Sequence, residues 1–220
     1  MRDAMVALAR RRIESTALVH RHSFSLKTRN TTFNADGQDF NIVRTGLWAR
    51  LLFTPISPDF PWQLRQIIRT FKPDILHLHL PNPSAFWLLT LPAAKRIPWV
   101  VHWHADVITS AQDWRMKLFY HFYQPFERAV LKQASAIIAT SSAYRDASRP
   151  LSEWLQKCEV VPLGVDIMRF STPGAANKPS AQRDSRLQVL AVGRHTYYKG
   201  FAYLIEAAVQ APDIHIHLVG

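Results

Sequence analysis

Cysteine, acidic residues and long apolar runs are all scarce in this sequence of 220 residues. The single cysteine, Cys158, excludes an internal disulfide and offers no cysteine pair with which to hold a metal ion. Scarcity of cysteine is typical of proteins in a reducing compartment, and we therefore expect this protein in the cytoplasm.

The best apolar run, residues 85–94, has about half the length that a membrane-spanning helix needs, and it ends at Lys95 and Arg96. The first ten residues have the pattern of a helix and contain no site typical of signal-peptide cleavage. The sequence therefore predicts neither a transmembrane segment nor a secretory signal.

Basic residues outnumber acidic ones by 27 to 16, which gives a formal net charge of +11. Most of the excess lies in residues 1–165, where 21 lysines and arginines stand against 12 aspartates and glutamates. An excess of this size favours anionic partners, such as nucleic acid, an anionic bilayer surface or a phosphorylated substrate. Composition alone does not choose among these partners.

Short apolar runs alternate with segments of helical periodicity, which is the pattern of an α/β protein whose mostly parallel sheet is covered on both faces. Pro125 and Pro150 predict a break or kink in two of the helices. Residues 30–37 are polar and are predicted to form a loop. Strands are expected at residues 16–20, 40–44, 75–80, 97–102, 136–140, 159–161, 189–192 and 214–219, and helices at 2–12, 62–71, from Ser84 onward, 113–133, 143–157 and 201–208.

The polar stretch at residues 171–186 is the best candidate for a linker, because the strand and helix pattern begins again after it. We therefore expect an N-terminal domain at residues 1–165, a linker at 166–186 and an incomplete second domain at 187–220. Two strands do not close a core, so the chain is expected to be cut at both ends.

The stretch from Val189 to Gly200 predicts a buried strand, a tight turn and the start of a helix. Gly193 ends the strand, and the turn carries the cations Arg194 and Lys199. A helix N-terminus favours anions through its free N–H groups and its dipole. A guanidinium and an ammonium beside it would make a seat for a diphosphate. The alternative is a solvated turn with two unrelated charges.

Five motifs in a fixed order carry a family resemblance. They are Phe71-Lys-Pro-Asp-Ile-Leu-His-Leu-His79, His102-Trp-His-Ala-Asp106, Ala134-Ser-Ala-Ile-Ile-Ala-Thr-Ser-Ser142, Val160-Val-Pro-Leu-Gly-Val-Asp166, and Val192-Gly-Arg-His-Thr-Tyr-Tyr-Lys-Gly200 leading into Leu204-Ile-Glu-Ala207. Together they resemble glycosyltransferase family 4, the retaining, nucleotide-sugar-dependent enzymes of the GT-B fold. The likeness is strongest to bacterial mannosyltransferase-like members that assemble polysaccharides.

The resemblance implies two Rossmann-like domains, with the acceptor bound mainly by the first and the donor mainly by the second. It places Arg194 and Lys199 on the family's cations for the donor diphosphate, with Gly193 beside them. It places His104 on the family's N-domain histidine, at the carboxyl end of a strand, where it would line the reaction centre. Gly164 would lie at a turn beside the cleft, and the need for a tight turn is sufficient to explain a glycine there.

The implied reaction moves a hexose, such as mannose, from a nucleoside-diphosphate sugar to a glycan or lipid-linked acceptor. Neither metal nor cofactor is expected, because the two cations would stabilise the leaving diphosphate. His102 and the pairs His77/His79 and His215/His217 are interpreted as strand histidines and not as metal ligands, because no carboxylate or cysteine joins them in sequence.

Two parts of the family pattern do not occur in the chain. A glycine-rich loop would precede Met1, and paired glutamates that position the donor would follow Gly220. We therefore expect this chain to be inactive or very weak alone.

Three alternatives remain at this point. The aromatic and basic helix near residues 114–132 suits either a membrane interface, which would place the protein at the inner face of the plasma membrane, or an ordinary core. The high charge also suits a nucleic-acid-binding α/β protein, although the cations are scattered and no known module is present. The chain could also be a non-catalytic interaction domain of the same fold.

Overall fold

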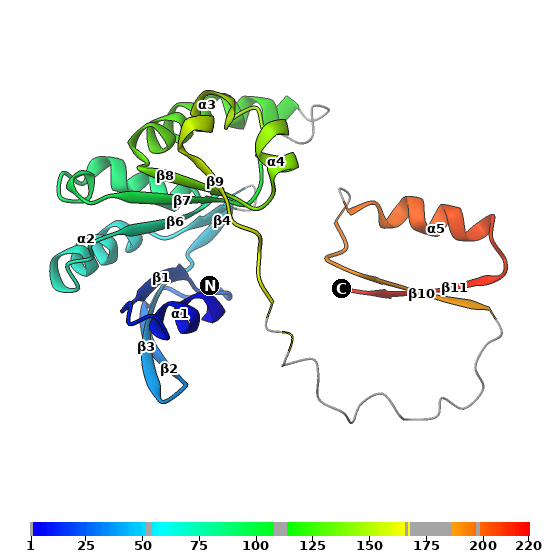
Figure 1. The fold of residues 1–220 in the computed structure, drawn as a ribbon, viewed down its shortest axis with the longest axis horizontal. Helices are drawn as coiled ribbons and strands as arrows, with labels where there is room; N and C mark the ends of the chain where they lie inside the picture. The colour runs from blue at the N-terminus through cyan, green and yellow to red at the C-terminus, as the bar shows by residue number, and fades with distance from the viewer. Residues whose placement is uncertain (1, 52–53, 108–113, 166, 168–185, 197–198) are drawn as a thin grey trace. The chain divides into compact units, whose positions relative to one another are not determined.

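The computed structural model describes residues 2–51, 54–107, 114–165, 167, 186–196 and 199–220 (Figure 1). These residues belong to two compact units, 1–164 and 165–220, which we describe separately. The predicted linker at 166–186 lies almost entirely outside the described residues. Within the described residues, none of the helices has the length and apolar character required to cross a bilayer.

A four-stranded parallel sheet forms the centre of the first unit. Its strands stand in the order β6 (Leu76–Leu80), β7 (Trp99–Trp103), β8 (Ala136–Ala139) and β9 (Cys158–Val160). Helices connect them, as parallel strands require. These are the 3-10 helices η1 (Pro83–Thr90) and η2 (Ala94–Arg96), then α3 (Trp114–Gln133), α4 (Ser142–Ala147) and the 3-10 helix η3 (Ser152–Lys157), with α2 (Phe60–Thr70) before β6.

One face of this sheet carries the main core. Trp99, Val101 and Trp103 of β7 have no exposed surface, and they pack in one cluster with residues of α2, η1 and α3. The Nε1 of Trp99 donates a hydrogen bond to the carbonyl of Ala94 at 2.8 Å. The opposite face is only partly covered, since His77 there is exposed. The prediction that both faces are covered is therefore wrong for the described residues.

A second, mixed sheet stands in the order β1 (Thr16–His20), β3 (Gln38–Thr45) and β2 (Arg29–Ala35). β1 and β3 are parallel, whereas β2 and β3 form an antiparallel hairpin. Residues 30–37, predicted to be a loop, are thus a strand and its turn. Asp36 and Gly37 both have positive φ, as a two-residue hairpin turn requires. The polar composition suggested a loop, but it reflects the position of this strand, whose side chains are largely exposed.

Helix α1 (Arg2–Ala9) packs on the second sheet through Met5, which contacts a small core of Ala17, Phe40 and Ile42. Two short antiparallel strands, β4 (Ala49–Leu51) and β5 (Thr54–Ile56), lie between this sheet and α2 in the chain.

The helices follow the prediction in part. Oγ of Ser141, the residue before α4, accepts a hydrogen bond from the N–H of Tyr144 at 3.2 Å and so caps this helix. The break predicted at Pro150 falls between α4 and η3. Helix α3 continues through Pro125 without a break. The helix expected from Ser84 is the 3-10 helix η1, and its cap is Asn82, whose side chain accepts from the N–H of Ser84.

In the second unit, β10 (Leu187–Val192) and β11 (Ile214–Val219) form a parallel pair, and α5 (Phe201–Val209) connects them. The strand, turn and helix predicted around Gly193 are therefore present. The prediction of a buried strand is wrong, because Leu190 and Val192 are 66% and 71% exposed. A two-stranded sheet with a single helix leaves most of its apolar surface in contact with water.

Candidate functional site

The histidine predicted to be catalytic, His104, directly follows β7 at the carboxyl end of the parallel sheet. Its N–H donates to the carbonyl of Leu80 at 2.9 Å, which holds its backbone beside the end of β6. Its Nε2 lies 2.8 Å from Nδ1 of His79, so the two rings share a hydrogen bond. Ligands of α/β proteins bind at this edge of the sheet.

Four histidines gather on the open face of β6 and β7. Side chains alternate along a strand, so the alternation that buries Leu78 and Val101 places the histidines on the opposite face. His79 is paired with His102 across the two strands. The ring centroids of His102 and His104 are 4.2 Å apart, and those of His79 and His104 are 5.1 Å apart. His77 stacks on His79 at 4.7 Å.

The local environment keeps these imidazoles neutral. Burial, followed by the neighbouring histidines, lowers the pKa of His79 to about 3 and that of His102 to about 4. Burial also lowers the pKa of His77 and of His104. A neutral imidazole offers one N–H donor and one lone pair, which suits a hydrogen bond with a sugar hydroxyl. Nε2 of His102 is buried and has no hydrogen-bond partner among the described residues.

Asp106 lies two residues after His104 and fixes the segment that follows β7. Its Oδ1 accepts three hydrogen bonds, from Nε1 of Trp103 at 2.8 Å, the hydroxyl of Tyr144 at 2.6 Å and Oγ of Ser148 at 2.8 Å. The donors come from β7, from α4 and from the residue that caps α4. This carboxylate therefore ties the end of β7, which His104 directly follows, to a helix about 40 residues further along the chain.

Glu127 is a buried carboxyl group in α3, with 1% of its surface exposed. The hydroxyl of Tyr120 donates to its Oε2 at 2.9 Å, whereas its Oε1 has no partner among the described residues. Burial raises the pKa of Glu127 from 4.5 to about 7. A carboxyl group that titrates near neutral pH makes the stability of the fold depend on pH.

We expect Glu127→Gln to remove a pH dependence of stability. Between about pH 4.5 and 7 the unfolded chain loses the Glu127 proton while the folded chain keeps it, so the free energy of unfolding falls as the pH rises. The shift corresponds to about 3 kcal/mol. Urea denaturation of both proteins at pH 5 and pH 8 measures it. Glutamine still accepts from Tyr120, so equal pH dependence in the two proteins would show that Glu127 does not titrate in this range.

The predicted diphosphate seat lies in the second unit, between the carboxyl end of β10 and the N-terminus of α5. The N–H of Gly193 donates to the carbonyl of Val219 at 2.8 Å, and Arg194 follows with an exposed side chain. Lys199, also exposed, stands two residues before α5. Gly200 caps this helix with a φ of 72°, a conformation that side chains disfavour. Both cations therefore belong to the segment that joins β10 to α5, and Lys199 stands directly before the residue that caps the helix.

Gly164 follows β9 in an irregular segment at the end of the first unit. Its φ is not positive, and a Cβ atom placed on it would meet nothing within 4 Å. Neither backbone conformation nor packing requires glycine there. Residues 161–165 form no turn, so the expected tight turn is absent from this structure.

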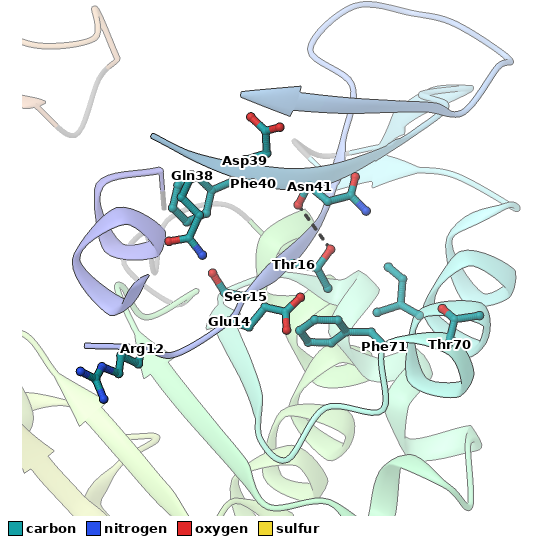
Figure 2. A pocket seen from close by; sticks show the side chains of 11 residues that line it. Arg12, Glu14, Ser15, Thr16, Gln38, Asp39, Phe40, Asn41, Thr70 and Phe71 are labelled. Carbon is teal, nitrogen blue, oxygen red and sulfur yellow. Dashed lines mark hydrogen bonds between the residues drawn. The ribbon is translucent and has the colours of Figure 1, made fainter. Parts of the chain in front are cut away.

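A pocket of about 480 Å³ opens between the second sheet and the end of α2 (Figure 2). Figure 2 shows Thr16 at the start of β1, Gln38 at the start of β3 and Phe71 just after α2 on its wall. This is the amino edge of the parallel pair β1 and β3, opposite the edge at which α/β proteins bind ligands. The pocket is therefore a poorer candidate than the surroundings of His104.

A family model described as "Glycosyl transferase 4-like domain" matches residues 1–164, three quarters of the chain. The chain belongs to this glycosyltransferase family. The family predicted from the five motifs is thus confirmed, and so is the enzyme class that it implies, a transferase by resemblance.

Two curated relatives resemble this glycosyltransferase chain. The O-antigen chain mannosyltransferase C of Escherichia coli is 26% identical over 173 residues, which cover 78% of this chain and 44% of the relative. The D-rhamnosyltransferase WbpZ of Pseudomonas aeruginosa is 27% identical over 186 residues, which cover 81% of this chain and 45% of the relative. The matched part therefore spans less than half the length of either relative.

Solved structures show the same fold. Sucrose-phosphate synthase from Thermosynechococcus elongatus has a TM-score of 0.67 at 19% identity, over 100% of this chain and 55% of that one. A trehalose-6-phosphate synthase has a TM-score of 0.58 at 10% identity, over 99% and 61%. HepE from Anabaena, solved in complex with UDP and glucose, has a TM-score of 0.50 at 20% identity, over 81% and 47%. The predicted α/β fold of the GT-B type is confirmed.

In the sequence of this glycosyltransferase domain, the histidines stand in two separate pairs. The spacing His77-x-His79 and His102-x-His104 was visible, but the register that pairs His79 with His102 is set by the fold. The partners of Asp106 were not predicted either. A tyrosine 38 residues away and a serine 42 residues away leave no local signal in the sequence.

Proposed function

We propose that this glycosyltransferase transfers a hexose, such as mannose, from a nucleoside-diphosphate sugar to a glycan or lipid-linked acceptor, with retention of configuration. The observation that carries the proposal is the pair Arg194 and Lys199 between β10 and α5, in a chain of this family. The curated relatives are named as mannosyl and rhamnosyl transferases, and HepE was solved with UDP and glucose. These names support an activated sugar as the donor.

In the proposed reaction Arg194 and Lys199 bind the diphosphate of the donor, and Gly193 lets the chain pass close to it. Negative charge grows on the diphosphate as the bond to the sugar breaks. Cations held at this position would stabilise the transition state more than the ground state. Two fixed cations and a helix N-terminus would serve this purpose without a metal ion.

His104 is proposed to bind a hydroxyl group of the transferred sugar. Its Nε2 already shares a hydrogen bond with His79, so Nδ1 is the ring nitrogen that remains for the hydroxyl group. His79 would therefore act as a positioning residue that sets the orientation of His104. In this proposal the first unit supplies the acceptor side of the reaction, and Gly164 lies beside the acceptor.

The proposal is tested by measuring release of nucleoside diphosphate and formation of a labelled glycan from UDP-glucose and GDP-mannose. We expect little or no transfer by the 220-residue chain alone and clear transfer when a complete donor domain follows the first unit. Clear transfer by the chain alone would refute its proposed dependence on further donor-domain residues. Acceptor-independent hydrolysis, or no reaction with any sugar nucleotide, would contradict the proposed reaction.

We expect His104→Ala in the active protein to lower kcat by about 100-fold while free nucleoside diphosphate binds with unchanged affinity. The loss would come from a hydrogen bond made to the sugar and not to the nucleotide. His121→Ala is the matched control, because His121 is an exposed histidine of the same unit. Unchanged turnover in His104→Ala would remove this residue from the site.

Peripheral contact with an anionic membrane is proposed for helix α3. The helix buries Tyr123, Val130 and Leu131, as a core helix does. It also exposes a stripe at a spacing of four residues, formed by Leu118, Phe122 and Phe126, which are 53%, 66% and 52% exposed. The same helix carries the exposed cations Lys117 and Lys132, and an apolar stripe together with cations suits the interface of an anionic bilayer. The inner face of the plasma membrane is the proposed location.

We expect the double variant Leu118→Ser/Phe122→Ser to weaken binding to vesicles rich in phosphatidylglycerol by about 10-fold or more. Each substitution removes apolar surface that the bilayer would otherwise bury. Co-sedimentation with these vesicles and with neutral phosphatidylcholine vesicles measures the effect. Trp62→Ser is the control, because Trp62 is an aromatic residue of α2 with 63% exposure. Equal loss in the control variant would contradict a specific role for α3.

A further inference from the structure

Three imidazoles on the central sheet converge closely enough to share one ligand. His77 and His79 of β6 and His102 of β7 each offer one ring nitrogen, and these nitrogens all lie within 4.8 Å of one another. The rings are stacked, with centroids 4.7 to 5.6 Å apart. Among the described residues, this is the group of potential metal ligands that the fold brings together.

The backbone beneath these side chains is held by the core. The intervening residues, Leu78 on β6 and Val101 and Trp103 on β7, are buried on the far face of the sheet. His79 faces His102 across the strand pair, and His77 lies two residues earlier on the same face. The core therefore fixes the backbone positions that carry the three imidazoles, and only their side chains have to adjust when a ligand binds.

The hydrogen-bond pattern also indicates a missing partner. Nε2 of His102 is buried and unpaired among the described residues, although a buried polar nitrogen normally has a partner. Nδ1 of His79 is bonded to His104 at 2.8 Å. Imidazoles that bind metals have this arrangement, with one nitrogen on the ion and the other fixed by a neighbouring group.

We propose that His77, His79 and His102 bind one divalent transition-metal ion of the Zn²⁺, Ni²⁺ or Cu²⁺ class. Three imidazole nitrogens match these ions, whereas Mg²⁺ and Ca²⁺ prefer oxygen ligands. Around a tetrahedral ion with bonds of about 2.1 Å, the ligand nitrogens stand about 3.4 Å apart. The nitrogens here lie within 4.8 Å of one another, so side-chain rotation has to close the group, and the exposed side chain of His77 has the most room for it. Water fills the remaining position.

This site is distinct from the proposed transfer reaction, in which no metal takes part. The two are connected through His79. Binding of the ion to Nε2 of His79 leaves its Nδ1 as the donor toward Nε2 of His104, which fixes the tautomer of His104. An ion bound here would therefore orient the histidine proposed to contact the sugar.

Metal binding is tested on the untagged 220-residue chain after treatment with a chelator. Zn²⁺ is titrated by calorimetry, and Co²⁺ is titrated by its visible absorption, which reports coordination geometry directly. We expect one ion per chain and displacement of Co²⁺ by Zn²⁺. His102→Ala and His77→Ala should each weaken binding by about 100-fold or more, because two imidazoles are left; His104→Ala should weaken it by about 10-fold.

The matched control is His215→Ala/His217→Ala in the second unit, a stacked histidine pair on β11 with centroids 4.6 Å apart. It should leave stoichiometry and affinity unchanged. Circular dichroism of each variant verifies folding, and His77→Ala is the variant least able to disturb it because the side chain is exposed. Absence of stoichiometric binding, or equal loss in the control pair, would overturn the proposal whether or not the chain transfers sugar.

Discussion

Asp106→Ala is expected to lower the free energy of unfolding by about 3–5 kcal/mol, which is the largest effect we expect from a single substitution outside the apolar core. Three donors converge on one oxygen of Asp106, and two of them belong to residues that are almost fully buried, Trp103 and Ser148. A buried donor that loses its acceptor costs about 1–3 kcal/mol. The losses do not add fully, because the donors can partly rearrange.

Urea denaturation at pH 7 measures the change, with the slope of the transition as a check that the native fold is retained. Asp106→Asn keeps one acceptor oxygen and should lose about 1–2 kcal/mol, since the acceptor becomes neutral and the second oxygen becomes an NH2 group. Asp146→Ala is the matched control, because Asp146 is an exposed aspartate of α4 whose ion pair with Arg145 lies at the surface. A loss in Asp106→Ala no greater than in this control would show that the network contributes little.

The same substitution bears on the proposed site. Asp106 holds the segment two residues beyond His104, so Asp106→Ala should displace His104 as well as destabilise the fold. Asp106→Asn keeps the acceptor and should preserve the position of His104. In an active protein, we therefore expect Asp106→Ala to lower transfer strongly at a temperature where the variant is still folded, and Asp106→Asn to lower it only slightly.

The alternation of strands and helices was predictable because each element has a strong local pattern. Leu78 and Leu80 on β6, and Trp99, Val101 and Trp103 on β7, show the two-residue period of strands with one buried face. The turn at Gly200 was predictable because glycine readily adopts a positive φ, and the structure has 72° there.

Other features depended on contacts between distant residues. The strand at Arg29–Ala35 was missed because its side chains are mostly polar, although Asp36-Gly37 is a typical hairpin turn. The histidine cluster required the pairing register of β6 and β7, and the role of Asp106 required the packing of α4. The site was thus predictable where one segment forms it and not where several segments meet.

Replacing both Arg194 and Lys199 with alanine is expected to lower kcat/KM for sugar transfer by about 1,000-fold or more in a protein with a complete donor domain. Loss of one preorganised donor to a developing negative charge costs about 100- to 1,000-fold, and the two cations would act on the same diphosphate. Each single variant should therefore lose about 100-fold. Steady-state kinetics at several donor concentrations measure these losses.

One conservative variant separates the effect of charge from the effect of side-chain geometry. Arg194→Lys keeps the charge but loses the planar fork that binds two oxygens, so we expect it to recover only part of the activity. Arg186→Ala is the matched control, because Arg186 precedes β10 and so lies at the opposite end of the same strand from Arg194. If transfer depends on the general positive charge of the second unit, the control will lose as much as Arg194→Ala. If transfer depends on a diphosphate seat before α5, only the Arg194 and Lys199 variants will lose activity. A fall in kcat larger than any rise in KM will then show that these two residues act mainly on the leaving group.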